Sequence, residues 1–227
     1  GTLYGSAKTG STGIDGNALI LNENNENNGY MQLPSGIFKG VNDFTVATWV
    51  NVKSAESYAR IFDFGMNSNG GNMFLTPFGG GQLVFAITNS GAGSEQRLTY
   101  TQLSTTDEWV HIAITMQGDT VTLYLNGVNV AQKDGFTFTP SSALGEDINN
   151  YIGKSFYGAD RYFRGSFDDY RIYDSALSQK DLLSLAYPNI QNIVSIDNVT
   201  ASTDIGIIPE LPSYVTVHYE DGTSGSL

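Results

Sequence analysis

The stretch WVHIAITMQGDTVTLYLNGVNV, residues 109–130, determines a local fold with little help from the rest of the chain. Apolar residues alternate with polar ones over residues 110–116 and again over 121–125, so each run predicts a strand with one buried face. Asn126-Gly127 follows the second run, and this pair favours the two-residue turn of a tight hairpin because both positions need positive φ. The stretch therefore predicts a three-stranded antiparallel meander.

Most of the first 173 residues consist of similar strand-like segments: short runs rich in Val, Ile, Thr, Tyr and Phe that are separated by Gly and Asn. No helical periodicity interrupts these runs, which is typical of a sandwich or jelly roll and argues against a parallel nucleotide-binding sheet. We therefore predict an all-β fold, a two-sheet antiparallel jelly-roll sandwich. Its clearest further strands are expected at residues 44–52, 60–64, 73–76, 83–88 and 167–173.

Composition limits the possible partners. The 227 residues include 12 Phe and 13 Tyr, which supply large side chains for two facing sheets, and they carry a net charge of -12. Phosphate binding needs clustered Lys and Arg, which this chain lacks, so we expect neither nucleic acid nor an anionic membrane as a partner. Without cysteine there is no disulfide or thiol nucleophile. No apolar run approaches the roughly 18 residues of a membrane span, so no membrane insertion is expected.

The N-terminal sequence GTLYGSAKTG lacks the charged and apolar regions of a signal peptide. We therefore expect the chain to be an excised part of a larger protein. Low Lys, abundant Asn, Gly, Thr and Tyr, and an acidic balance are typical of secreted bacterial modules, so a secreted or cell-surface location is expected.

Residues 174–187 break the strand pattern and predict one short C-terminal helix. Ser178 and Asp181 have the spacing of a capping box, leucines follow on one stripe, and Pro188 ends the pattern. We expect this helix to close the sandwich edge and to carry no chemistry.

The tail after the helix predicts strands at 193–199 and 214–219, with an extended segment at 209–212. About 40 residues with so few strands cannot enclose a core alone. We therefore predict a jelly roll over residues 1–187, followed by a partial β segment over residues 188–227.

Several motifs occur along the chain in a characteristic order. They are GNAL at 16–19, YMQLP at 30–34, DFTVATWV at 43–50, RIFDFG at 60–65, WVHIA at 109–113, LYLNG at 123–127 and GSFDDYRIYDSALS at 165–178, with IPELPSYVTV at 208–217 and YEDGT at 219–223 in the tail. With the first seven motifs, the jelly-roll region resembles laminin-G-like, concanavalin A-like domains over about residues 14–187. With the last two, the tail resembles the opening of a bacterial immunoglobulin-like domain, and both modules together resemble the accessory regions of secreted glycoside hydrolases.

The resemblance implies a non-catalytic binding module that commonly carries calcium. The residues agree with the absence of catalysis, since glucanases on this fold usually carry a Glu-x-Asp-x-x-Glu strand pattern that is missing here. The one compact acidic pair, Asp168-Asp169, lies in a strand whose adjacent side chains point to opposite faces. Neither His111 nor His218 has neighbours that suggest a catalytic triad. No catalytic residue is therefore expected.

A calcium ion is expected at Asp168 if that carboxylate shares a buried face with Tyr170 and Ile172. Asp15 and Asn17 would supply further oxygens, since first and last strands lie side by side in many jelly rolls. The alternative is that Asp168 pairs with Arg171 or Arg164 or faces water. The Asn-rich loop at 22–28 lacks the EF-hand pattern, so it is interpreted as a solvated hairpin tip.

Sugar binding needs an aromatic platform with polar groups around it, because a sugar ring has an apolar face and a rim of hydroxyls. The resemblance implies Arg60 and Asp160 as ligand contacts, and two loops add aromatic and charged groups. The alternative is a set of surface ion pairs that attach loops to the sandwich. The candidate carbohydrate-binding residues are Arg60, Asp63, Glu95, Gln96, Arg97, Tyr157, Asp160, Arg161 and Tyr162.

These observations predict a carbohydrate-binding module of a secreted bacterial enzyme that degrades polysaccharides or glycans. Its expected partners are a polysaccharide or glycan and a catalytic domain in the same parent chain. The alternatives are a cell-surface adhesion or protein-interaction domain and a structural spacer. Exposed aromatics in a concave site would favour sugar, whereas a broad, flat apolar patch would favour a protein partner.

Overall fold

The computed structural model describes residues 1–105, 107–146, 148–188, 193–198, 215–219 and 224–226. The chain divides into two compact units, Gly1–Leu182 and Leu183–Leu227, which are described separately. Among the described residues, neither α-helix has the length and hydropathy needed to cross a membrane.

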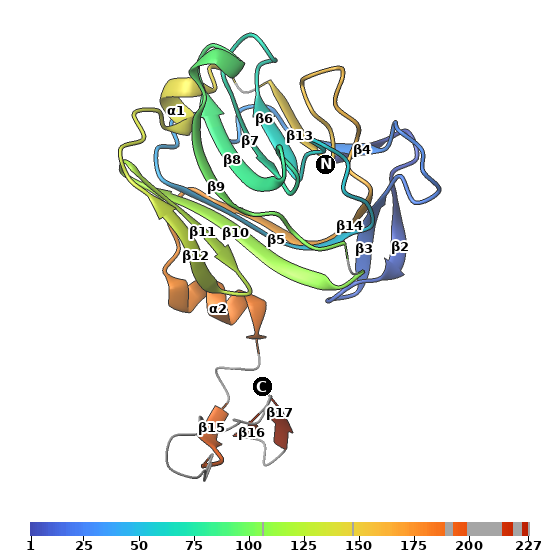
Figure 1. Cartoon of the computed structure of the whole chain (residues 1–227), viewed down its shortest axis with the longest axis vertical. Coiled ribbons are helices and arrows are strands. Elements are labelled where there is room, and N and C mark those ends of the chain that lie inside the picture. Colours follow the sequence, from blue (N-terminus) through green and yellow to red (C-terminus); the bar gives the residue numbers. More distant parts are fainter. Residues whose placement is uncertain (106, 147, 189–192, 199–214, 220–223, 227) are drawn as a thin grey trace, which may run out of the picture. The chain divides into compact units, whose positions relative to one another are not determined.

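The first unit contains two antiparallel sheets of seven strands each, so the predicted jelly-roll sandwich is confirmed (Figure 1). Sheet A consists, in spatial order, of β1 (Thr2–Tyr4), β4 (Tyr30–Leu33), β13 (Asn149–Ile152), β6 (Phe62–Gly65), β7 (Asn72–Thr76), β8 (Gln82–Thr88) and β9 (Gln96–Thr101). Sheet B consists of β12 (Val128–Lys133), β11 (Thr120–Leu125), β10 (Trp109–Gln117), β5 (Phe44–Val52), β14 (Gly165–Tyr173), β3 (Asn17–Leu21) and β2 (Lys8–Thr12).

The meander at 109–130 is present as β10, β11 and β12. Asn126 and Gly127 have φ values of 50° and 75°, as the tight turn between β11 and β12 requires. Asn126 also accepts a hydrogen bond at Oδ1 from the His111 N–H, 2.9 Å away, which ties the turn back to β10. The local prediction is confirmed in both position and turn geometry.

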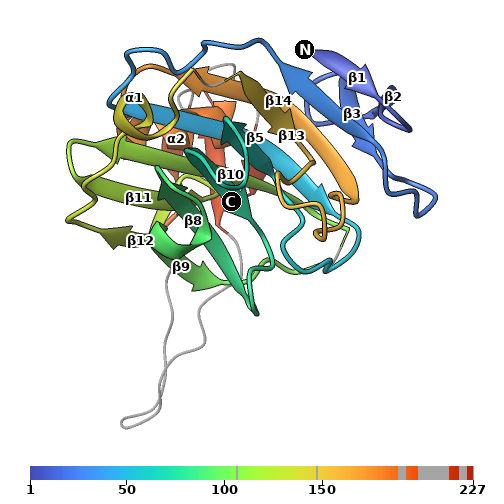
Figure 2. The same cartoon turned by 90° about the horizontal axis from the view of Figure 1, so that it is seen from above.

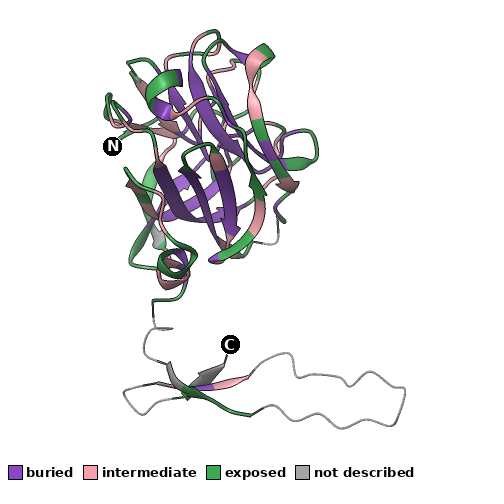
Figure 3. Ribbon diagram, turned by 90° about the vertical axis from the view of Figure 1, so that its left-hand side faces the viewer, coloured by how far each residue is buried: buried purple, intermediate pink, exposed green. Residues whose placement is uncertain are grey.

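The core lies between the two sheets, and the strands coloured as buried in Figure 3 supply most of it (Figures 2 and 3). Phe44 and Val50 of β5 face Phe62, Phe64 and other apolar side chains of sheet A, and these residues are almost entirely buried. Full burial of one such side chain contributes about 1.5–3 kcal/mol, so this core stabilises the sandwich without disulfides. The many Phe residues of the sequence supply much of this core.

A second row of side chains crosses sheet A on the face that points away from the core. The strand neighbours of this row, such as Phe62, Met73 and Leu98, belong to the core, so the row itself lies outside. Cross-strand register aligns its members as Gln32, Tyr151, Asp63, Phe74, Ala86 and Arg97. This outer face of sheet A presents aromatic and charged groups together.

Helical segments of the described chain are the 3₁₀ turn Ala92–Ser94, α1 (Pro140–Ala143) and α2 (Gln179–Ala186). The capping box predicted before α2 is confirmed. Ser178 N donates to Asp181 Oδ2 at 3.1 Å, and Asp181 N donates to Ser178 Oγ at 3.2 Å. One short C-terminal helix therefore follows the last strand of the sandwich, as expected.

The tail contains a small antiparallel sheet of β15 (Ile193–Ile196), β16 (Thr216–Tyr219) and β17 (Ser224–Ser226). Two of these strands fall within the stretches expected at 193–199 and 214–219. The extended segment predicted at 209–212 lies outside the described residues. The immunoglobulin-like character of the tail stays a prediction.

Candidate functional site

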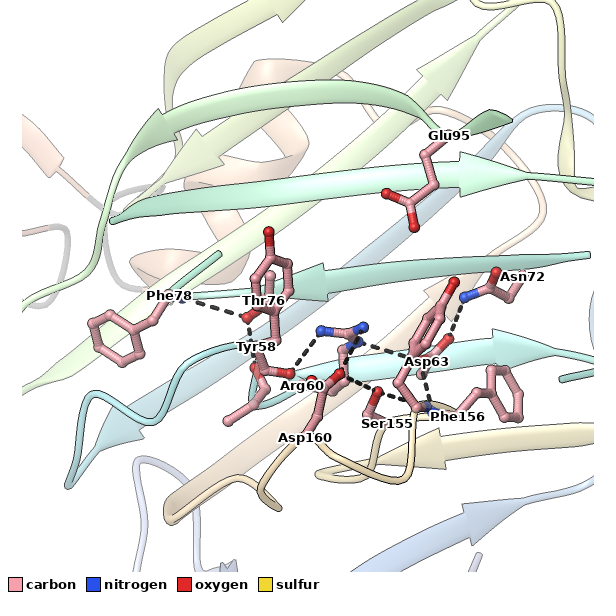
Figure 4. A network of polar contacts seen from close by, with 12 residues as sticks. Tyr58, Arg60, Asp63, Asn72, Thr76, Phe78, Glu95, Ser155, Phe156 and Asp160 are labelled. Atoms are coloured by element: carbon pink, nitrogen blue, oxygen red, sulfur yellow. Dashed lines mark hydrogen bonds and ion pairs between the residues drawn. The ribbon is translucent and has the colours of Figure 1, made fainter. Parts of the chain in front are cut away.

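A cavity of about 320 Å³ opens on the outer face of sheet A. Segments far apart in the sequence meet there: the approach to β6, the start of β9, and the β13–β14 loop (residues 153–164) (Figure 4). We call it the Arg60 cavity. It is lined by Tyr58, Arg60, Phe74, Ala92, Glu95, Arg97, Tyr157, Ala159 and Asp160.

The Arg60 guanidinium is held from three directions. Nη1 donates to the Tyr58 carbonyl at 2.6 Å, Nε donates to Asp63 Oδ2 at 3.2 Å, and Nη2 lies 3.3 Å from Asp160 Oδ2. Its Cζ lies 3.9 Å from the centre of the Phe74 ring, so the cation stacks on an aromatic face. A buried guanidinium with this many partners is fixed before any ligand arrives.

Asp63 lies behind Arg60 and is fully buried. It accepts hydrogen bonds from Asn72 Nδ2 at 2.9 Å and from the Phe156 N–H at 3.1 Å, besides the Arg60 bond. Burial raises the pKa of this carboxyl to about 6, although Arg60, Asn72 and the Phe156 N–H all act to lower it. Asp63 therefore positions Arg60 and does not reach the cavity surface.

Asp160 is held by its own loop. Its Oδ2 accepts from Ser155 Oγ at 2.7 Å, and Ser155 Oγ in turn accepts from the Tyr157 N–H at 3.0 Å. The Asp160 N–H donates to the Tyr157 carbonyl at 3.0 Å, which closes a tight turn. The side chain of Asp160 remains 19% exposed, so its carboxylate can accept from a ligand hydroxyl.

A second ion pair forms the opposite side of the cavity. Glu95 Oε2 accepts from Arg97 Nε at 2.7 Å and lies 2.5 Å from Arg97 Nη2. The Glu95 side chain is only 3% exposed, whereas Arg97 is 41% exposed. Gln96 lies between them in sequence and turns the other way, where its amide bonds Thr137. Gln96 therefore does not join the cavity.

Tyr58, Phe74 and Tyr157 supply the aromatic walls. The Tyr157 hydroxyl is buried and has no hydrogen-bond partner among the described residues. Sequence reasoning missed Tyr58 and Phe74. Phe74 is flanked by apolar residues, so the sequence alone does not show that it faces away from the core. Tyr58 has a φ of 57°, a loop conformation with no sequence signal here.

The structure brings most of the predicted sugar-binding residues together. Arg60, Glu95, Arg97, Tyr157 and Asp160 line the cavity, and Asp63 supports Arg60 from behind. The other three lie outside it: Gln96 as described, Arg161 at 3.3 Å from Glu56, and Tyr162 against the Tyr30 ring at 5.9 Å.

Asp168, the centre of the expected calcium site, instead receives backbone N–H groups. Its Oδ2 accepts from Ile14 N at 2.6 Å and Asp15 N at 2.8 Å, and its Oδ1 accepts from Asp169 N at 2.8 Å. These three N–H groups satisfy the carboxylate without a cation. The side chains of Asp15 and Asn17 are exposed. The calcium site stays a prediction that the contacts at Asp168 do not favour.

The expectation that Asp168 shares one face of its strand with Tyr170 and Ile172 is wrong. A register shift in β14 between Asp168 and Arg171, with Asp169 at φ 46°, breaks the alternation of the strand. Tyr170 and Ile172 pack against the core, as Phe167 does, whereas Asp168 follows Phe167 directly and lies on the other face. Arg171 bonds Asp169 at 2.6 Å and not Asp168.

The fold and this cavity define a lectin-like β-sandwich with aromatic walls and fixed charged groups. A family model described as the concanavalin A-like lectin/glucanases superfamily matches residues 25–182, and the chain belongs to this family. The resemblance of the jelly-roll region to this family is thereby confirmed.

The chain is similar to three known proteins, to the third of them in fold alone. An α-L-arabinofuranosidase of Bifidobacterium longum subsp. longum is 26% identical over 159 residues, which are 65% of this chain and 15% of that protein. Domain 4 of AbnA, a GH43 extracellular arabinanase of Geobacillus stearothermophilus solved with arabinotriose, is 25% identical with a TM-score of 0.67 and covers 80% of this chain and 82% of that one. The CBM40 of the Ruminococcus gnavus IT-sialidase has a TM-score of 0.57 at 15% identity, covering 69% and 96%.

Proposed function

We propose that the chain is a non-catalytic carbohydrate-binding module of a secreted bacterial polysaccharide-degrading enzyme, and that it binds arabinose-containing chains in the Arg60 cavity. The observation that carries the proposal is the cavity itself, in which three aromatic rings surround a fixed guanidinium and two carboxylates. The partly exposed Tyr58 and Tyr157 rings can stack on the apolar face of a sugar, whereas the buried Phe74 ring supports Arg60, and the fixed charges can bond the sugar hydroxyls.

The arrangement of the carboxyl groups at the Arg60 cavity supports a non-catalytic role. A glycosidase needs a protonated carboxyl and a second carboxylate that both reach the glycosidic bond. Asp63 is the carboxyl whose pKa is raised, to about 6, but it is fully buried behind Arg60. Asp160 and Glu95, which line the cavity, each contact a guanidinium instead. The groups are thus arranged to hold a ligand.

Arabinose-containing chains are proposed because two relatives point to them. The AbnA domain was solved with arabinotriose, and the curated relative is an α-L-arabinofuranosidase. The chain spans only 15% of that relative, so its activity belongs to a far longer protein. In the proposed arrangement the module holds a catalytic domain of the same parent chain close to its polymer, which raises the effective concentration of substrate.

The test is calorimetric titration of the chain with arabinotriose and with arabinan, beside galactan, fructan and sialyllactose. We expect binding to arabinose-containing ligands, weakened about tenfold or more in Asp160→Asn and Tyr157→Ala, since a hydrogen bond to a charged group contributes about 1.5–3 kcal/mol. Arg161→Ala is the matched control, because Arg161 neighbours Asp160 in sequence but pairs with Glu56 outside the cavity.

Equal loss in Arg161→Ala would show that the loop had merely been disturbed. Binding to another sugar with the same dependence on Asp160 would keep the site and replace the ligand. If no sugar binds the native chain, an adhesion or spacer role takes the place of this proposal.

A further inference from the structure

Four tyrosines gather at the other end of the outer face of sheet A. Tyr4 of β1 and Tyr30 of β4 are directly opposite in register, and their rings stack at 4.8 Å with an interplanar angle of 8°. Tyr30 also meets Tyr151 of β13 edge to face at 5.4 Å and Tyr162 of the β13–β14 loop at 5.9 Å. We call Tyr4, Tyr30, Tyr151 and Tyr162 the tyrosine platform.

Lys154 fixes the platform. Its ammonium lies 4.2 Å from the Tyr30 ring centre and 4.4 Å from the Tyr151 ring centre, so it contacts two aromatic rings at once. Tyr151 is further held by its hydroxyl, which donates to Asn149 Oδ1 at 3.1 Å. The rings are therefore pre-organised, and a ligand that stacks on them orders few side chains.

A hollow of about 400 Å³ lies beside the outermost ring of the platform. Thr2, Tyr4 and Gln32 line it, and Thr2 faces Gln32 directly across the β1–β4 pair. Tyr4 is 41% exposed, which is high for an aromatic residue that already stacks on a neighbour. A ring face next to a hydroxyl and an amide is the combination that sugar recognition uses.

The platform and the Arg60 cavity share one sheet face and one loop. Tyr151 is opposite Asp63 in register, so the two sets occupy neighbouring strands. The β13–β14 loop contributes Tyr157 and Asp160 to the cavity and Lys154 and Tyr162 to the platform. From β6 to β1 there are three strand spacings, about 14 Å. A single sugar residue does not cover that distance, whereas an oligosaccharide does.

We propose that the tyrosine platform is a second saccharide-contact surface, with Tyr4 as its stacking residue, and that a chain anchored in the Arg60 cavity extends over the β13–β14 loop to reach it. This inference rests on the proposed function and makes the ligand a chain of several sugar residues. The module then binds along a polysaccharide and not only at one sugar unit.

The test measures dissociation constants by titration calorimetry for a length series of linear arabino-oligosaccharides. We expect affinity for the native chain to rise with length, and Tyr4→Ala to remove that rise while leaving the shortest bound oligosaccharide unaffected. The loss for the longest member is expected to be about tenfold, the size of one aromatic contact. Tyr4→Phe keeps the ring and is expected to keep the rise.

Tyr187→Ala is the matched control, because Tyr187 is 38% exposed and lies outside the platform. Melting curves of all variants check that the edge strand β1 remains in place. If Tyr4→Ala binds every length as the native chain does while Asp160→Asn still weakens binding, the platform inference is overturned and the proposed function stands. If no oligosaccharide binds the native chain, both are overturned.

Discussion

At the scale of single residues, Asn22 connects three segments of the chain. It is fully buried, and its φ of 55° lies in the left-handed region that Asn tolerates. Nδ2 donates to the Gly29 carbonyl at 3.0 Å and to the Phe163 carbonyl at 2.7 Å. Oδ1 accepts from the N–H groups of Asn28 and Gly29 and from Ser6 Oγ. The side chain replaces backbone pairing at the point where β3 ends.

We expect Asn22→Ala to lower the free energy of unfolding by about 3 kcal/mol, because it leaves several buried donors and acceptors without partners. Asn24→Ala is the matched control: Asn24 lies in the same loop, is exposed, and hydrogen-bonds the nearby Glu26. Urea unfolding of both variants checks this. Equal stability of the two variants would contradict the role given to Asn22.

His111 is the residue from which a pH dependence of stability is expected. It is buried against Trp49, with the ring centres 5.4 Å apart, and burial lowers its pKa from 6.5 to about 4, with Asp169 acting to raise it and Arg171 to lower it. The unfolded chain therefore binds a proton between pH 6.5 and 4 that the folded chain does not. Stability from this group is present above pH 6.5 and is lost as the pH falls towards 4.

We expect the native protein to lose about 3 kcal/mol more than His111→Gln between pH 7 and pH 4, at about 1.4 kcal/mol for each pKa unit. Asp63, whose pKa is raised, acts in the opposite sense over part of this range, but it is present in both proteins and cancels. Chemical denaturation across the range is the measurement. Parallel stability curves for the two proteins would show that His111 does not titrate as inferred.

Residues such as Asn22 mark the limit of sequence reasoning at this scale. The Asn-rich loop at 22–28 indicates a solvated hairpin tip, and its middle is indeed exposed. Nothing local separates Asn22 from Asn24, because the difference arises from the Phe163 carbonyl, which lies 141 positions away in sequence. A hydrogen bond of that kind is determined by the assembled sandwich and not by the neighbouring residues.

At the scale of elements, Asp168 fastens the β2–β3 hairpin to β14. Its carboxylate accepts three backbone N–H groups, two of them from the turn that joins β2 to β3. Gly13 in that turn has no room for a side chain, since an added Cβ would lie 2.2 Å from Asp168 Oδ2. The contact is therefore close-packed as well as polar.

We expect Asp168→Ala to lower the free energy of unfolding by about 2–4 kcal/mol, because three N–H groups lose their acceptor. We also expect a chelator to leave the melting temperature of the native protein unchanged, since three N–H groups already satisfy the Asp168 carboxylate. Asp15→Ala serves as the control, because the Asp15 side chain is exposed and only its backbone contacts Asp168. A fall in melting temperature with chelator would restore the calcium prediction.

The strands show which elements a sequence predicts well. A run rich in β-branched and aromatic residues predicts the strand at residues 44–52, which is β5 and is buried at every position, and alternation predicts the meander. The edge strands β1 and β2 were not predicted, because they are short and carry few apolar residues. The bulge in β14 was also missed, as it is set by Asp169 in a left-handed conformation that its sequence does not require.

At the scale of the whole molecule, the candidate site also has features that the sequence predicts and features that it does not. The residues that could be predicted are charged or aromatic groups in loops, such as Arg60, Asp160 and Tyr157. The direction of neighbouring side chains could not be predicted: Gln96 and Arg161 follow Glu95 and Asp160 in sequence but lie outside the Arg60 cavity. Residue types indicate a kind of ligand, whereas the direction of each side chain depends on the strand and turn that carry it.

The division into two compact units gives a prediction for the chain as a whole. The core cluster of the sandwich runs from Leu19 to Phe167, and every residue that lines the Arg60 cavity lies within that range. The helix α2 ends at Ala186. A chain cut after residue 187 therefore keeps the core, the cavity, the tyrosine platform and the complete helix.

We expect residues 1–187 alone to melt cooperatively within a few degrees of the full chain, because removal of the small tail sheet takes no side chain from the core cluster. The dissociation constants for the arabino-oligosaccharide series should also be unchanged. Differential scanning calorimetry and the same titrations measure both. Retained melting with weakened binding would show that residues 188–227 contribute to the ligand surface, whereas loss of cooperative melting would show that the sandwich depends on the tail for its stability.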